Sequence, residues 1–211
     1  MKPIQAKSAG ISLILGCLFM IVTMILHPVG GDFEHLLRII TIGRVSHIIA
    51  IISIPLVAYG FLGLTQKLES SLSNISFSFM LFGLIAVLFA GAVNGLILMD
   101  FVERYEGASE ETIASLKPIF RLISSFNHAF DFIFIGAVCL STGLWSLVIL
   151  KKKTFPNLLG WLGIMITIAA LVSLIAGFVF VDLHGFRIFI FGWVIWVVGI
   201  GWNLAKSRDN A

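Results

Sequence analysis

Five histidines and most of the acidic residues fall near the same ends of the apolar segments of this chain. Nine of the eleven acids lie on the same predicted side as all the imidazoles. Imidazole and carboxylate groups bind divalent metals and transfer protons near neutral pH. This gathering predicts a polar pocket at one end of the molecule. The histidines are His27, His35, His47, His128 and His184.

One interpretation of the gathering is a site for a divalent metal such as zinc. Nitrogen and oxygen ligands suit zinc or another transition ion. A metal-bound water would make the protein a membrane hydrolase acting at the outer leaflet. The spacing gives no HExxH or HxxxH pattern. The candidate metal ligands are His47, Asp100, His128 and Asp182, and the residues expected to bind a small ligand around them are His27, Arg44, Asn94, Asp131, His184 and Arg187.

A second interpretation is a single b-type haem whose axial ligands are His47 and His128, because helix bundles hold cofactors between facing helices. In this respect the chain resembles the respiratory cytochrome b, in which the second and fourth helices supply the ligands. The resemblance covers those two positions only. The residues thirteen positions beyond them are Gly60 and Ser141, where that family has its paired histidines, so a second haem is not expected.

A third interpretation is a structural membrane protein in which the cluster is only a polar cap. Arginines would neutralise aspartates there, and histidines would sit at the interface, because their rings tolerate both media. The pairs would form among Arg44, Arg121 and Arg187 and the carboxylates of Asp100, Asp131 and Asp182. These three interpretations remain open from the sequence alone.

Membrane-spanning helices must position these residues. Of the 211 residues, 59% are hydrophobic and 12% are charged, which excludes a soluble enzyme core and intrinsic disorder. The apolar runs are continuous, as in helices that cross about 30 Å of hydrocarbon, and do not alternate as in a β-barrel. We expect one all-α integral membrane domain over 1–211, with six transmembrane helices at about 10–27, 46–65, 76–99, 125–150, 157–181 and 186–205.

Charge sidedness predicts the orientation of these helices. The face with both termini and the turns at 66–75 and 151–156 holds eight Lys or Arg, Lys2 and Arg208 among them, against two acids, one of which is Asp209. The other face holds six against nine. Because Lys and Arg favour the cytoplasm, we expect cytoplasmic termini in the plasma (inner) membrane, anchored by the lysines at 151–153, with the pocket facing outward. The basic balance reflects contact with the lipid bilayer and not nucleic-acid binding.

An internal repeat relates two predicted hairpins at a shift of 81 to 83 residues. Ser46-His47 matches Asn127-His128, and Asp100 matches Asp182, each aspartate following a small-xxx-small pattern. Small residues four apart let membrane helices pack closely. The repeat predicts duplicated hairpins of helices two–three and four–five that form a four-helix core, with the first and last helices outside it.

Helical spacing connects the fourth span to the pocket. Arg121, Ser125, His128 and Asp131 follow spacings of four, three and three, which predicts one shared face. Just before this span, Ser109 followed by two glutamates is typical of a helix N-terminus. We therefore expect a short helix in the loop 101–118 that covers the pocket or leads into the fourth span.

Overall fold

The computed structural model describes residues 4–207, so Lys2, Arg208 and Asp209 of the charge comparison lie outside the described residues. Within 4–207 the chain is helical without strands. The elements are α1 (Ala6–Leu26), α2 (Phe33–Leu68), α3 (Ser71–Gly91), the π-helix η1 (Ala92–Ile97), α4 (Leu98–Arg104), α5 (Glu110–Ser115), α6 (Lys117–Lys152), α7 (Asn157–Ile175) and α8 (Leu183–Lys206).

Six helical segments are long and apolar enough to cross a membrane, which confirms the predicted all-α polytopic class. The third of them is continuous through α3, η1 and α4. Both α2 and α6 have 36 residues, or about 54 Å at 1.5 Å per residue, well beyond the roughly 30 Å of hydrocarbon. They begin earlier than expected, because an apolar run marks where a helix meets lipid and not where its backbone hydrogen bonds start.

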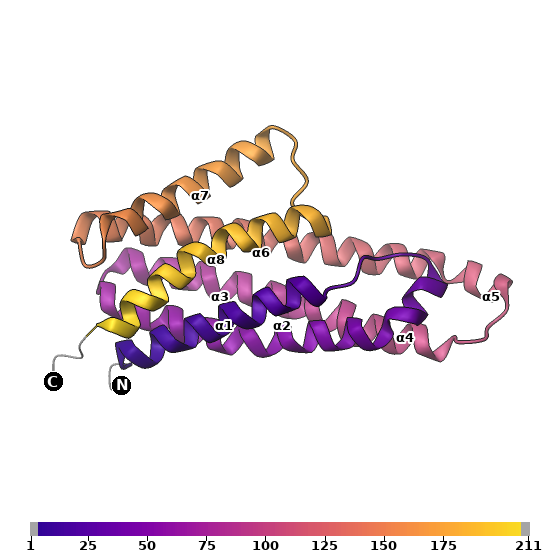
Figure 1. Ribbon diagram of the computed structural model, residues 1–211. Helices are drawn as coiled ribbons and strands as arrows, with labels where there is room; N and C mark the ends of the chain where they lie inside the picture. The colour runs from indigo at the N-terminus through magenta and orange to yellow at the C-terminus, as the bar shows by residue number, and fades with distance from the viewer. Residues whose placement is uncertain (1–3, 208–211) are drawn as a thin grey trace.

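The two ends of the bundle differ in what they hold (Figure 1). The start of α1 and the end of α8 lie at one end, here called the terminal end, where Lys152 Nζ donates to the Glu69 carbonyl at 2.7 Å. The other end, here called the α5 end, holds α4, α5 and the first turns of α2 and α6. Ser109 accepts from the Thr112 amide at 3.3 Å and caps α5, as its sequence predicts.

An aromatic cluster forms the core in the terminal half of the bundle. Phe61 of α2 stacks on Trp145 of α6 and on Trp193 and Trp196 of α8, with ring centroids 4.8, 5.8 and 6.2 Å away. All four side chains are fully buried. The three indole N–H groups donate to Ser73 Oγ, Thr142 Oγ1 and the Leu159 carbonyl. The last helix, expected outside the core, therefore supplies much of it.

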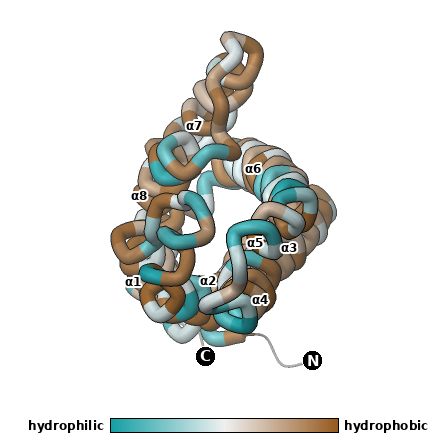
Figure 2. The backbone as a smooth tube through the Cα atoms, turned by 90° about the vertical axis from the view of Figure 1, so that its right-hand side faces the viewer, coloured by the Kyte–Doolittle hydropathy of each residue, from teal (hydrophilic) through white to brown (hydrophobic). Residues whose placement is uncertain are grey.

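The outermost span is α7 and not α1 or α8. Only 22% of the α7 span is buried, and α7 leans away from the ring of the other helices (Figures 1 and 2). By contrast, α1 packs along both α2 and α8. Gly10 of α1 and Gly201 of α8 allow the backbones of these two helices to approach closely. The packing thus differs from the predicted four-helix core, because α7 is mostly exposed, whereas α3, its expected counterpart in the repeat, packs against both α2 and α6. The repeat itself stays a prediction.

Candidate functional site

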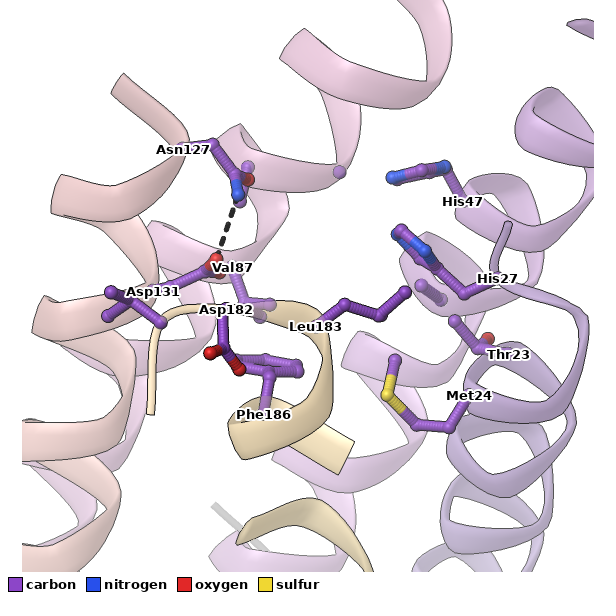
Figure 3. Close-up of a pocket in the computed structure, with 14 residues that line it drawn as sticks. Thr23, Met24, His27, His47, Val87, Asn127, Asp131, Asp182, Leu183 and Phe186 are labelled. Atoms are coloured by element: carbon purple, nitrogen blue, oxygen red, sulfur yellow. Dashed lines mark hydrogen bonds between the residues drawn. The ribbon is translucent and has the colours of Figure 1, made fainter. Parts of the chain in front are cut away.

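A cavity of about 130 Å³ lies in the α5 half of the bundle, and it is here called the histidine cavity. Its walls come from the end of α1, from α2, from α3, from α6 and from the segment that enters α8. In Figure 3, His27 and His47 lie on one side of it, and Asn127 and Asp131 lie on the other. The polar lining residues are Thr23, His27, His47, Asn127, Asp131 and Asp182.

The two histidines of this cavity are held in the same tautomer. His47 Nδ1 lies 2.7 Å from the Gly43 carbonyl, one turn earlier in α2. His27 Nδ1 lies 2.9 Å from the Pro28 carbonyl, just after α1 ends. Since a carbonyl oxygen only accepts, each Nδ1 must donate. In the neutral rings, each Nε2 is then left as an acceptor without a hydrogen.

The π-helical turn η1 makes room for His47. Gly95 of η1 lies directly against the His47 side chain, and a Cβ at this position would overlap the His47 Cβ. Such wide turns within α-helices are frequent at functional sites. The same turn carries Asn94, whose Nδ2 donates to the Ala90 carbonyl at 2.9 Å and also reaches α6. The turn therefore contacts His47 on one wall of the cavity through Gly95 and Asn127 on the opposite wall through Asn94.

Two side-chain amides and a carboxylate form a chain of hydrogen bonds on that opposite wall. Asn94 Nδ2 donates to Asn127 Oδ1 at 2.5 Å, and Asn127 Nδ2 donates to Asp131 Oδ2 at 2.9 Å. Asp131 is only 8% exposed. A buried carboxylate needs hydrogen-bond partners, and Asn127 supplies one, which leaves the other Asp131 oxygen for the cavity.

The entrance to α8 closes the cavity and anchors the end of α1. Asp182 caps α8 by accepting from the Gly185 amide at 2.6 Å. Arg187 Nε donates to the Met24 carbonyl at 3.1 Å, and a terminal guanidinium nitrogen donates to the His27 carbonyl at 2.7 Å. Burial, the neighbouring His47 and Arg187 together lower the pKa of His27 to about 4, against the raising effect of the Pro28 carbonyl. His27 is therefore neutral at pH 7.

The hydrogen-bonding groups that remain for a ligand are mostly acceptors. The Thr23 hydroxyl donates to the Ser46 carbonyl at 3.3 Å, and one Asn127 amide hydrogen is donated to Asp131. The groups that remain are Nε2 of each histidine, carboxyl oxygens of Asp131 and Asp182, and the second amide hydrogen of Asn127. Such a cavity complements a ligand that carries O–H or N–H groups. Its volume is close to the roughly 150 Å³ of an engineered protein cavity that accommodates benzene.

The predicted site residues divide into two groups in the structure. His27, His47, Asp131 and Asp182 line one cavity, as the charge sidedness suggested. Asn94 stands behind this wall, and Arg187 binds backbone carbonyls. The other four, Arg44, Asp100, His128 and His184, lie elsewhere: Arg44 pairs with Glu103 at 2.5 Å, Asp100 pairs with Arg104 at 2.9 Å, and His128 and His184 are exposed.

These pairings differ from those of the polar-cap hypothesis. That hypothesis pairs Arg44, Arg121 and Arg187 with aspartates. The two ion pairs found among residues 4–207 are instead Arg44–Glu103 and Asp100–Arg104. Asp131 is instead bound by an amide, and Asp182 by a backbone N–H. The reason is geometric, since Arg104 lies one helical turn after Asp100 on an exposed face.

The candidate metal and haem ligands do not meet. His47 and Asp182 line the histidine cavity, whereas Asp100 and His128 are exposed and lie outside its lining. Across residues 4–207, no group of three or more His, Cys, Asp or Glu side chains is placed to hold a metal ion. His47 and His128, the expected haem ligands, share no cavity, and a space of about 130 Å³ suits one ring and not a macrocycle.

Asn127 is the site residue that the sequence interpretation missed. The side of α6 that lines the histidine cavity and a larger cavity at the α5 end runs through Arg121, Ser124, Asn127 and Asp131. Of the expected face, Arg121 and Asp131 belong to this side, whereas Ser125 and His128 are exposed and line neither cavity. Spacings of three, three and four from Arg121 fit a helical face as well as spacings of four, three and three do, so the sequence already contained a pattern that includes Asn127.

No protein-family model, curated protein or solved structure matches the chain.

Proposed function

We propose that this membrane protein binds a small hydrogen-bond-donating ligand, a hydroxylic or amine compound about one ring in size, in the histidine cavity. The observation that carries the proposal is the pair of ring nitrogens committed to carbonyl oxygens, at Gly43 and Pro28. This commitment leaves two Nε2 acceptors that face a buried carboxyl group at Asp131. A ligand hydroxyl or ammonium group would satisfy acceptors that otherwise lack a donor within the cavity.

The proposal includes an orientation and a location. Exposed lysines gather at the terminal end, with Lys151, Lys152 and Lys153 adjacent to one another. Because clustered Lys and Arg favour the cytoplasmic side, we place both termini in the cytoplasm and the α5 end on the outer side of the plasma membrane. The ligand then enters the histidine cavity from the outer side.

A divalent metal is the second candidate occupant. Histidines that bind metals almost always donate their other ring N–H to a carbonyl or carboxylate, which fixes the tautomer, and His27 and His47 both do so. Two protein nitrogens would leave the remaining positions of the metal to water or to a ligand. The donor-bearing ligand is favoured, since the carboxylates are not placed to complete a metal site.

A matched pair of ring compounds tests the proposal. The purified full chain in detergent is heated with phenol, with the nearly isosteric fluorobenzene, or with Zn²⁺ alone. We expect phenol to raise the melting temperature and fluorobenzene to leave it unchanged, because only phenol donates a hydrogen bond. Bound ligand stabilises by about 2.7 kcal/mol at a hundred times its Kd, so the shift should grow with phenol concentration.

Variants locate the effect. His27→Phe and His47→Phe keep an aromatic ring but remove its nitrogens, and each should abolish the phenol shift, while His184→Phe, an exposed control, should retain it. Asp131→Asn provides a second route if a histidine variant does not fold. Equal shifts with phenol and fluorobenzene would contradict the proposal. A shift with Zn²⁺ alone that both histidine variants remove would assign the cavity to a metal instead.

A further inference from the structure

A second and larger cavity, here called the end cavity, lies at the α5 end of the bundle and has a volume of about 820 Å³. It is formed by the loop before α2 and the first turns of α2, by η1 and α4, by α5, and by the first turns of α6. Asn127 lines both cavities, so the Asn94–Asn127 hydrogen bond lies between them. The proposed ligand site does not use the end cavity.

Opposite charges line the end cavity from different elements. Asp32 and Glu34 come from the start of α2, and Glu110 comes from α5. Lys117 and Arg121, one turn apart, come from α6. None of the five belongs to the two ion pairs found within residues 4–207, and Asp32 caps α2 through the His35 amide at 2.8 Å. The cavity therefore presents cations and anions that neutralise no partner of the chain.

The remaining lining of the end cavity is largely apolar. Side chains of α2, α4, α5 and α6 supply this surface, namely Phe33, Leu36, Leu98, Ile113, Phe120 and Ile123. A ligand that fills this space would need charged groups of both signs together with an apolar part. A soluble ion would leave most of the surface uncovered.

Exposed apolar and charged side chains indicate the depth of the end cavity in a membrane. Large apolar side chains that are strongly exposed continue along the helices as far as Ile97 in η1 and Leu122 in α6, which are 58% and 57% exposed. In a membrane protein such side chains face the hydrocarbon. Charged residues follow directly, with Asp100 three positions after Ile97 and Arg121 next to Leu122. The lining charges thus lie where hydrocarbon gives way to head groups.

We propose that the end cavity binds the head group of a zwitterionic phospholipid from the leaflet at the α5 end. The phosphate lies against Lys117 and Arg121, since a guanidinium group binds phosphate through paired hydrogen bonds. The ammonium group lies against Glu34 and Glu110. An anionic lipid satisfies only the basic pair and places a negative charge beside unpaired carboxylates, so the cavity discriminates against it.

Competitive lipid retention tests this assignment. The purified full chain is mixed with equimolar phosphatidylethanolamine and phosphatidylglycerol of the same acyl chains, and bound lipid is counted by native mass spectrometry. We expect several-fold preferential retention of phosphatidylethanolamine. The double variant Glu34→Gln/Glu110→Gln should lose this preference, and Lys117→Gln/Arg121→Gln should retain less of both lipids. The control Glu106→Gln/Lys151→Gln removes one exposed charge of each sign outside the cavity and should behave as the unaltered chain.

Three results would overturn the assignment: equal retention of the two lipids by the unaltered chain, preference that survives in Glu34→Gln/Glu110→Gln, and displacement by an equal concentration of glycerophosphoethanolamine. The last result would assign the cavity to a soluble phosphoamine. His27→Phe should leave lipid preference unchanged while it abolishes the phenol shift. Failure of one proposal is therefore distinguishable from failure of the other.

Discussion

The imidazole rings of His27 and His47 lie 4.7 Å apart, centre to centre, although one follows the end of α1 and the other lies within α2. Each ring donates its Nδ1 hydrogen to a main-chain carbonyl, and neither ring has a carboxylate partner among the hydrogen bonds and ion pairs described. Two rings at this distance repel each other when both are protonated. The doubly protonated state of the pair is therefore disfavoured.

The neutrality of His27 predicts acid sensitivity. The pKa of His27 is lowered from 6.5 to about 4, so between these values the unfolded chain binds a proton that the folded chain does not. The protein should lose stability as the pH falls below 6.5, down to about pH 4, by about 3 kcal/mol at the most. Melting temperatures measured across this range check the prediction.

Two variants separate this effect from general acid denaturation. His27→Phe cannot titrate and should flatten the pH dependence between 6.5 and 4, whereas the exposed His184→Gln should not change it. Should both variants keep the slope of the unaltered chain, His27 is not its source.

Replacing Asn127 should destabilise the fold far more than replacing its neighbour His128. Asn127→Ala removes the amide that joins Asn94 to Asp131 and leaves a buried carboxyl group without that donor, which costs about 1–3 kcal/mol. His128→Ala alters an exposed side chain and should change stability by less than about 0.5 kcal/mol. Thermal unfolding of the two variants side by side measures the difference, and a larger loss at His128 would mean that α6 is rotated from the orientation described.

Gly95 should tolerate no side chain. In Gly95→Ala the added methyl group overlaps the His47 Cβ, and overpacking of this kind typically costs about 1–3 kcal/mol. Gly136→Ala is the matched control, since a Cβ there meets no neighbouring atom; it should stabilise α6 by up to about 1 kcal/mol through helix propensity. Melting temperatures that fall equally in both variants would refute the close approach of η1 to His47.

Arg187 should hold the end of α1 in place. Arg187→Gln removes two hydrogen bonds from a charged group to the carbonyls of Met24 and His27, each worth about 1.5–3 kcal/mol. Hydrogen exchange should then accelerate at the amides of residues 24–27. The control Arg104→Gln breaks an exposed ion pair with Asp100 and should leave these amides protected, and protection retained in Arg187→Gln would exclude this anchoring role.

The membrane class and the six spans were predictable, because apolar composition over about 20 residues reports contact with hydrocarbon. The extent of α2 and α6 was not, since charged residues such as Arg38 and Lys117 continue a helix without being apolar. The contribution of α8 to the core could not be predicted either. A tryptophan such as Trp193 looks the same in sequence whether it faces lipid or, as here, an acceptor on Thr142.

The candidate site was predictable only in part. Charge sidedness predicted His27, His47, Asp131 and Asp182 at one end of the bundle, and in the structure these four line one cavity. It could not decide between Asn127 and His128, because adjacent residues of a helix differ by about 100° and both choices fit a polar face. The π-helical turn was not predicted either, because the sequence alone does not show that Gly95 lies against His47 of another helix.

The segment that carries Asp182 into the cavity wall is continuous with α7, the span with the smallest buried share. Most of the surface of α7 has no protein neighbour and would contact lipid in a membrane. In a membrane, bilayer thickness and lateral pressure on α7 would therefore reach the wall of the histidine cavity through six residues of connecting chain, 176–181. The affinity of the proposed ligand should for this reason differ between a short-chain detergent micelle and a native-thickness bilayer.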